Sequence, residues 1–121
     1  MKTDRKKIHQ MFGGRCCYCG EVLLTETGKY MHIEHLEPLE RVVRGKGCHR
    51  PQNENKANLM PCCPKCNIKK SSLPLESFRT EIMQTIENLI KYNNQFKQAQ
   101  RFGMIEIKIW DGVFWFEKYG K

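Results

Sequence analysis

The stretch that decides the fold is Asn58-Leu59-Met60-Pro61-Cys62-Cys63-Pro64-Lys65-Cys66-Asn67. Within it, two residues separate Cys63 from Cys66, and the same spacing occurs earlier at Cys16 and Cys19. A gap of two residues lets both thiolates of a turn face one tetrahedral metal ion, and two such turns complete a zinc site. The sequence therefore predicts a structural Zn²⁺ held by Cys16, Cys19, Cys63 and Cys66.

The other three cysteines are Cys17, Cys48 and Cys62, which we expect to be free thiols. The residues three positions after Cys17 and Cys62 are Gly20 and Lys65, so neither cysteine starts a pair at ligand spacing. An odd total of seven cysteines, with no signal-peptide pattern at the N-terminus, argues against a secreted disulfide framework. We therefore expect an intracellular, cytoplasmic protein. A redox pair is the competing interpretation, but no βαβ pattern surrounds either motif.

Length and charge narrow the class of protein. The chain has 121 residues, which fits a single domain over residues 1–121. Lys and Arg total 21 against 13 for Asp and Glu, and the net charge of +8 would attract polyanions, nucleic acid first. The alternative is a basic surface that contacts only solvent and binds no polyanion. No apolar run approaches the ~20 residues needed to span a bilayer, so no membrane partner is expected.

The separation between the two cysteine pairs is longer than in the simplest zinc ribbons, which favours a treble-clef-like core with folded chain between them. The expected elements, in chain order, are a helix within 2–11, a strand at 29–33, a strand from Leu59 that stops at Pro61, a helix from Pro64 to Ser71, a long helix from 75 to about Lys97 and a β-hairpin over 104–118. The hairpin follows from the alternation of Ile105, Ile107 and Ile109 ahead of Asp111-Gly112. We expect its aromatic residues to pack on the core rather than to contact nucleic acid.

Polar residues between and beside the cysteine pairs occur in a specific order: Glu34-His35, then Asn58, then Cys63-x-x-Cys66-Asn67 with Lys69 and Lys70 after it. This order resembles the HNH endonuclease family, whose core is the ββα-metal fold, over roughly residues 14–79. The resemblance implies an α+β protein. Its ββα-metal (treble-clef-like) core would carry the four-cysteine zinc site, and the C-terminal helix and hairpin of residues 75–118 would be additions.

The resemblance also implies a role for each polar residue. His35 matches the general base that activates water, while Glu34 and Asn67 match the ligands of a catalytic cation. Asn58 matches the middle Asn, which buttresses the loop and helps to orient His35. Glu34 stands where Asp is commoner, and Asn67 where His is commoner. Because both offer hard oxygen ligands, Mg²⁺ or Mn²⁺ is expected at this site rather than Zn²⁺.

Basic side chains flank this motif and are expected to bind phosphate without reading base sequence. They are Arg41, Arg44, Lys46 and Arg50 in the long loop over 36–57, and Lys69 or Lys70 after the second cysteine pair. A solvated loop face is the usual meaning of such scattered charge, but a long loop that enters and leaves beside the expected site favours phosphate contact.

Together these observations predict a metal-dependent DNA endonuclease of the HNH type. The family mostly leaves 3′-hydroxyl and 5′-phosphate ends, and its small members often belong to phages or mobile elements. Double-stranded DNA is the expected partner. The oligomeric state, monomer or homodimer, stays open. The first alternative is a non-catalytic, zinc-stapled nucleic-acid-binding module, and the second is a zinc-ribbon interaction protein without affinity for nucleic acid.

Overall fold

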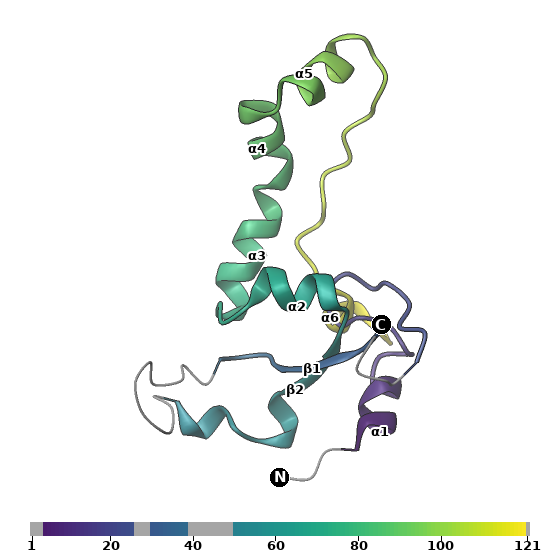
Figure 1. Cartoon of the computed structure of the whole chain (residues 1–121), viewed down its shortest axis with the longest axis vertical. Helices are drawn as coiled ribbons and strands as arrows, with labels where there is room; N and C mark the ends of the chain where they lie inside the picture. The colour runs from purple at the N-terminus through teal and green to yellow at the C-terminus, as the bar shows by residue number, and fades with distance from the viewer. Residues whose placement is uncertain (1–3, 26–29, 39–49, 121) are drawn as a thin grey trace. The chain divides into compact units, whose positions relative to one another are not determined.

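The computed structural model describes residues 4–25, 30–38 and 50–120 (Figure 1). The chain divides into two compact units. Unit 1 comprises Met1–Leu75 and Phe114–Lys121, and unit 2 comprises Glu76–Val113. The described elements make a small mixed α/β protein with one two-stranded antiparallel sheet and several helices.

The sheet of unit 1 pairs β1 (His32–His35) with β2 (Leu59–Cys62), and His35 lies opposite Leu59. Every residue of β2 is buried. The strand continues through Pro61, where it was predicted to stop. Proline is tolerated in edge strands, and both strands of a two-stranded sheet are edges. After β2 the chain enters α2 (Pro64–Lys70), which contacts β1 and matches the predicted helix (Figure 1).

Three short helical elements complete the first part of unit 1. They are α1 (Arg5–Gln10), η1 (Pro51–Asn53) and η2 (Lys56–Asn58). The first lies inside the helix predicted over 2–11. It begins at Asp4, whose carboxylate accepts a hydrogen bond from the Lys7 backbone N–H at 3.1 Å. The two 3₁₀ helices bring the chain into β2.

The C-terminal segment does not form the β-hairpin predicted over 104–118. Residues 104–113 contain no strand, and the chain after them forms a short helix, α6 (Trp115–Lys118). The turn at Asp111-Gly112 is nevertheless present. The Asp111 carboxylate accepts a hydrogen bond from the Val113 N–H at 3.0 Å, and Gly112 has a φ of 79°. The prediction therefore failed at the returning strand.

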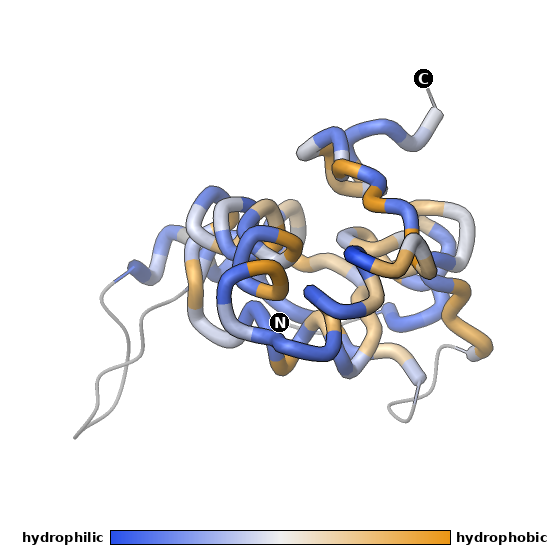
Figure 2. The backbone as a smooth tube through the Cα atoms, turned by 90° about the horizontal axis from the view of Figure 1, so that it is seen from above, coloured by the Kyte–Doolittle hydropathy of each residue, from blue (hydrophilic) through white to orange (hydrophobic). Residues whose placement is uncertain are grey.

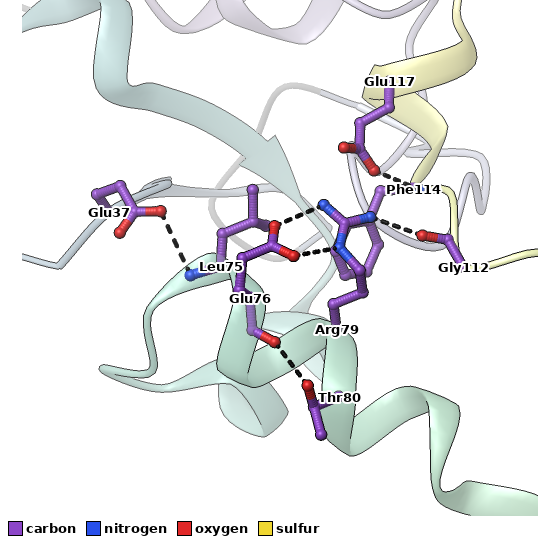
Figure 3. A network of polar contacts seen from close by, with 8 residues as sticks. All are labelled: Glu37, Leu75, Glu76, Arg79, Thr80, Gly112, Phe114 and Glu117. Carbon is purple, nitrogen blue, oxygen red and sulfur yellow. Dashed lines mark hydrogen bonds and ion pairs between the residues drawn. The ribbon is translucent and has the colours of Figure 1, made fainter.

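Aromatic packing replaces that strand. Phe114 is buried, and its ring centroid lies 5.3 Å from that of Tyr18. The Phe116 N–H donates to the Cys17 carbonyl at 2.8 Å, so the segment follows the first cysteine turn instead of residues 104–110. The Glu117 carboxylate accepts from the Phe114 N–H at 2.9 Å and so caps the start of α6 (Figure 3). These contacts confirm the structural role expected for the aromatic residues.

Unit 2 is helical, and its helices are α3 (Leu75–Met83), α4 (Thr85–Tyr92) and α5 (Asn94–Arg101). The single long helix predicted from residue 75 to about Lys97 is therefore wrong. Asn93 is extended, with φ −108° and ψ 108°, and its side chain accepts a hydrogen bond from the Phe96 N–H at 2.9 Å. An Asn with this geometry is a helix N-cap, so it ends one helix and begins the next. The apolar spacing continues across the break and conceals it.

Beyond α5, residues 104–113 run as an extended segment within unit 2 (Figure 1). One side chain ties the end of this segment to α3. The Arg79 guanidinium donates to the Gly112 carbonyl at 2.6 Å and pairs with the Glu76 carboxylate at 2.9 Å (Figure 3). This contact therefore links the end of the extended segment to the first helix of unit 2.

Hydropathy varies along the whole described trace, with polar and apolar residues interleaved (Figure 2). Among the described residues, no helix combines the length and the apolar character that crossing a bilayer would require.

Candidate metal centre and adjacent polar site

Four cysteine side chains come together in unit 1, and they are those that the spacing selected. The Sγ atoms of Cys16, Cys19, Cys63 and Cys66 all lie within 4.8 Å of one another. Those of Cys19 and Cys63 are 3.9 Å apart. A tetrahedral zinc site with Zn–S bonds of about 2.3 Å separates its sulfurs by roughly 3.8 Å. The group is therefore positioned to bind a metal ion such as zinc.

The first cysteine turn is shaped by backbone hydrogen bonds and one glycine. The Cys16 N–H donates to the Glu21 carbonyl at 2.8 Å, and the Gly20 N–H donates to the Cys16 carbonyl at 3.0 Å. Gly20 has a φ of 78°, and a Cβ there would lie 3.4 Å from the Trp115 ring. Glycine meets both demands, since it adopts positive φ without strain and leaves room for the indole. The turn thereby directs Cys16 and Cys19 to the same side.

The second turn uses the start of α2. Cys63 is the N-cap residue, and its sulfur accepts a hydrogen bond from the Cys66 N–H at 3.4 Å. Pro64 occupies the first helical position, where a missing N–H costs nothing and the fixed φ suits the helix. The second turn thereby places Cys63 and Cys66 on the same side of the start of α2.

Hydrogen bonds among Cys16, Cys19 and Cys66 give these three thiols different pKa values. Hydrogen bonds from Cys19 and Cys66 lower the pKa of Cys16 to about 2. The same contacts with Cys16 raise the pKa of Cys19 to about 12 and raise that of Cys66 as well. Cys16 is therefore favoured as the thiolate, while Cys19 and Cys66 hold protons. A bound divalent cation would displace those protons, because coordinated thiols are deprotonated.

Two further cysteines lie close by but outside this group. Cys17 and Cys62 are fully buried, and burial raises the pKa of both thiols. Buried thiols of raised pKa are unreactive, which agrees with the expectation that these two are free. Cys48 lies outside the described residues.

Glu34 lies in a buried polar cluster. Its carboxylate accepts a hydrogen bond from the Tyr18 hydroxyl and lies 3.6 Å from the Lys70 ammonium. Lys70 is completely buried and also donates to the His35 carbonyl at 3.2 Å. Burial raises the pKa of Glu34 to about 7, although the positive charge of Lys70 opposes this shift. Glu34 thus faces an internal cation from α2.

His35 points elsewhere. Successive side chains of a strand alternate between its two faces, so His35 and Glu34 diverge. The His35 Nε2 atom lies 3.0 Å from a carboxylate oxygen of Glu54, which precedes η2. The His35 side chain is 24% exposed and that of Glu54 is 46% exposed, so solvent reaches this pair.

Asn58 fastens the loop that follows His35. Its side-chain carbonyl accepts from the Glu37 N–H at 2.9 Å, and its amide donates to the Glu37 carbonyl at 2.8 Å. Its backbone carbonyl accepts from the Leu36 N–H at 2.8 Å. The Glu37 carboxylate in turn accepts from the Leu75 N–H at 3.4 Å (Figure 3). Asn58 therefore fixes the direction in which the chain leaves β1.

Asn67 lies one turn of α2 before Lys70, and its amide is 2.7 Å from the Nδ1 atom of His32. His32 and Glu34 share one face of β1, so α2 covers that face with Asn67 and Lys70. The structure thus joins Asn67 to His32 and Glu34 to Lys70. Among the described residues, no hydrogen bond or ion pair is seen between the His35 ring and Glu34 or Asn67.

The basic residues expected to bind phosphate differ in their surroundings. Arg41, Arg44 and Lys46 lie outside the described residues. Arg50 and Lys69 are exposed at the surface of unit 1. Lys70 has no exposed surface, so of the two adjacent lysines only Lys69 can meet a phosphate in this arrangement.

Two residues of this site were missed by sequence reasoning. Glu54 sits in a loop without periodicity, and nothing in its neighbours marks it as a partner of His35. Tyr18 lies inside the first cysteine turn, where spacing arguments consider only the cysteines. The pairing of His32 with Asn67 was missed as well, although a residue two before Glu34 shares its face of a strand.

No family model matches this chain, and no curated protein sequence matches it either. A function must therefore be argued from the arrangement of these residues.

Proposed function

We propose that this protein is a divalent-metal-dependent DNA endonuclease of the HNH type, built on a ββα-metal core. The observation that carries the proposal is the pair of hydrogen bonds between Asn58 and Glu37 next to the solvent-accessible His35. A middle Asn that buttresses the loop after the base is what the resemblance requires. The order of β1, β2 and α2, with the cysteine group at the start of α2, agrees with it.

His35 is the general base of the proposed reaction. If its Nε2–H donates to Glu54, the Nδ1 lone pair is left to accept a proton from water. The activated water attacks a phosphodiester phosphorus and gives its proton to His35, the bond to the leaving oxygen breaks, and that oxygen takes up a proton from solvent water. Glu54 acts as a positioning residue, because a carboxylate on one ring nitrogen fixes the tautomer and the ring direction.

The catalytic cation expected at Glu34 and Asn67 does not fit the observed contacts. The Glu34 carboxylate is buried against Tyr18 and Lys70, and the Asn67 amide contacts His32. We therefore derive no step through a cation at these residues. The proposed dependence on Mg²⁺ or Mn²⁺ is tested by comparing cleavage with each ion and with neither.

Zinc is the metal proposed for the four cysteines. Four thiolates close a tetrahedral coordination sphere and leave no position for a water molecule. The proposed role of this ion is therefore structural, since it joins the first cysteine turn to the start of α2. The competing redox role is disfavoured, because both pairs converge on one point.

The test is cleavage of supercoiled plasmid by the zinc-loaded protein with Mg²⁺, with Mn²⁺ and with neither ion. His35→Ala is expected to reduce nicking by about 10²–10⁴-fold, and Glu54→Gln by a smaller factor. His9→Ala is the matched control, because His9 bonds only to the Leu23 carbonyl and to Gln10 among the described residues. Equal nicking by wild type and His35→Ala would overturn the proposal.

The buried ion pair favours a second candidate function, a zinc-stapled module that binds nucleic acid without cleaving it. A Glu34 committed to Lys70 is the arrangement expected if no cation binds there. This candidate predicts that wild type and His35→Ala bind DNA equally and that neither nicks it with any ion. Its binding would weaken steeply with added salt.

A further inference from the structure

Met104–Trp110 is chemically symmetric about its centre. Around Ile107 the order is apolar, apolar, acidic, apolar, basic, apolar, apolar. If two such segments pair antiparallel with Ile107 at the centre, Glu106 of each copy lies opposite Lys108 of the other. Ile105 then lies opposite Ile109, and Met104 opposite Trp110.

Residues 105–109 have no strand partner within the described part of the chain. Alternation of this kind is typical of a strand, yet the described part of the chain gives residues 104–110 no β-bridge. No backbone–backbone hydrogen bond is formed by residues 105–109 within the described ranges. An extended backbone with unpaired N–H and C=O groups is a template for another strand.

Most side chains of the segment are exposed, while those of Ile107 and Trp110 are half-buried. Met104 is 73% exposed and Ile109 is 81% exposed. Glu106 and Lys108 are also exposed, and neither forms an ion pair with another described residue. Cross-strand pairing would cover the isoleucines and give each charge an opposite charge.

The charge of unit 2 permits two copies to approach. Residues 76–113 contain five basic and five acidic residues, so this unit has no net charge. The net charge of +8 therefore belongs entirely to the rest of the chain. A neutral surface with exposed apolar residues avoids the repulsion that a basic surface would impose on self-association.

We propose that Met104–Trp110 is a dimerisation strand, which pairs antiparallel with the same segment of a second copy about a two-fold axis at Ile107. Such an interface is isologous, so each contact occurs twice. The inference does not depend on nuclease activity, because it uses only residues of unit 2.

The test is sedimentation equilibrium of the full zinc-loaded chain over a concentration series. Wild type is expected to reach the dimer mass. Glu106→Lys and Lys108→Glu each place like charges opposite one another twice, and each should raise the dimer Kd by about tenfold or more. Glu87→Lys is the matched control, since it makes the same charge change at an exposed position of α4 and should leave the Kd unchanged.

Two combinations distinguish strand pairing from a general charge effect. The double variant Glu106→Lys/Lys108→Glu restores both opposite pairs and should recover the wild-type Kd. A mixture of the two single variants should form a heterodimer more tightly than either forms a homodimer. Wild type that stays monomeric at every concentration would overturn the proposal. Single variants with the wild-type dimer Kd would also overturn it. So would a double variant and a mixture whose Kd values are no lower than those of the single variants. If the segment binds a different molecule instead of a second copy, wild type will be monomeric at every concentration.

Discussion

Unit 1 and unit 2 are stabilised in different ways. In unit 1, Cys16 and Cys63 are almost completely buried, the four cysteines converge, and Glu34 and Lys70 form an internal ion pair. In unit 2, all of whose residues are described, Phe78 alone is buried, while several large apolar side chains are exposed. The helices of unit 2 depend on local hydrogen bonds and caps.

The difference follows from size and composition. A small segment cannot bury enough apolar area to stabilise itself, so it needs either a metal or a partner. Unit 1 contains the four cysteines that are positioned to bind a metal ion. Unit 2 has no cysteine, and its exposed isoleucines and neutral charge are the features on which we base the proposed association with a second copy. Substitutions in unit 1 should therefore have larger effects than those in unit 2.

The largest effect is expected from loss of the metal ligands. Cys16→Ser should abolish binding of one equivalent of zinc and unfold unit 1, because structural zinc contributes on the order of 10 kcal/mol. Atomic emission gives the zinc content. Hydrogen exchange should show lost protection in β2 and α2 and little change in α4.

Cys62→Ala is the matched control for that variant, since it removes a buried cysteine outside the group. It should keep one zinc and lose only a modest part of the stability. Normal protection of α2 in Cys16→Ser, or zinc loss in Cys62→Ala, would contradict the assignment of the ligands.

A smaller effect is expected when the internal ion pair is broken. Lys70→Ala leaves the Glu34 carboxylate buried without its cation and should cost about 3–5 kcal/mol of unfolding free energy. Urea denaturation with zinc present measures it. Lys69→Ala, at the exposed neighbouring position, should change stability by less than about 0.5 kcal/mol. Equal losses in the two variants would show that Lys70 is not buried.

The raised pKa of Glu34 predicts that the free energy of unfolding depends on pH, with a change about as large as that expected for Lys70→Ala. Its pKa is about 7 in the folded chain and about 4.5 when unfolded, so between these values the folded state holds the additional proton. Stability should therefore fall as pH rises from 4.5 to 7, by about 3 kcal/mol in total. Glu34→Gln should lack this fall, while the titration of the thiols affects both proteins alike. A difference between them that does not vary with pH would contradict the raised pKa.

The smallest effect is expected in unit 2. Arg79→Ala removes the hydrogen bond to the Gly112 carbonyl and the pair with Glu76, and should cost about 1 kcal/mol. Hydrogen exchange in α3 reports it. Arg101→Ala, at an exposed position of α5, should have no measurable effect. A loss in Arg79→Ala as large as in Lys70→Ala would contradict the contrast between the units.

Local patterns in the sequence determined a definite part of this protein. The two-residue spacing selected Cys16, Cys19, Cys63 and Cys66 from seven cysteines. With this spacing, a short turn can direct both of its thiolates to one tetrahedral ion. Pro64 and the residues after it indicated α2, because helix initiation is a local matter. Asp111-Gly112 indicated a turn for the same reason.

Only the tertiary structure decided which partners those residues meet. The alternation around Ile107 predicted a strand of a hairpin. The residues after Gly112 do not form the second strand, because Phe114 packs on Tyr18 of the first cysteine turn. Glu34 and His35 are adjacent in sequence, yet the strand sends one to Lys70 and the other to Glu54. These contacts join residues far apart in the chain, so they depend on packing and burial, which local spacing does not encode.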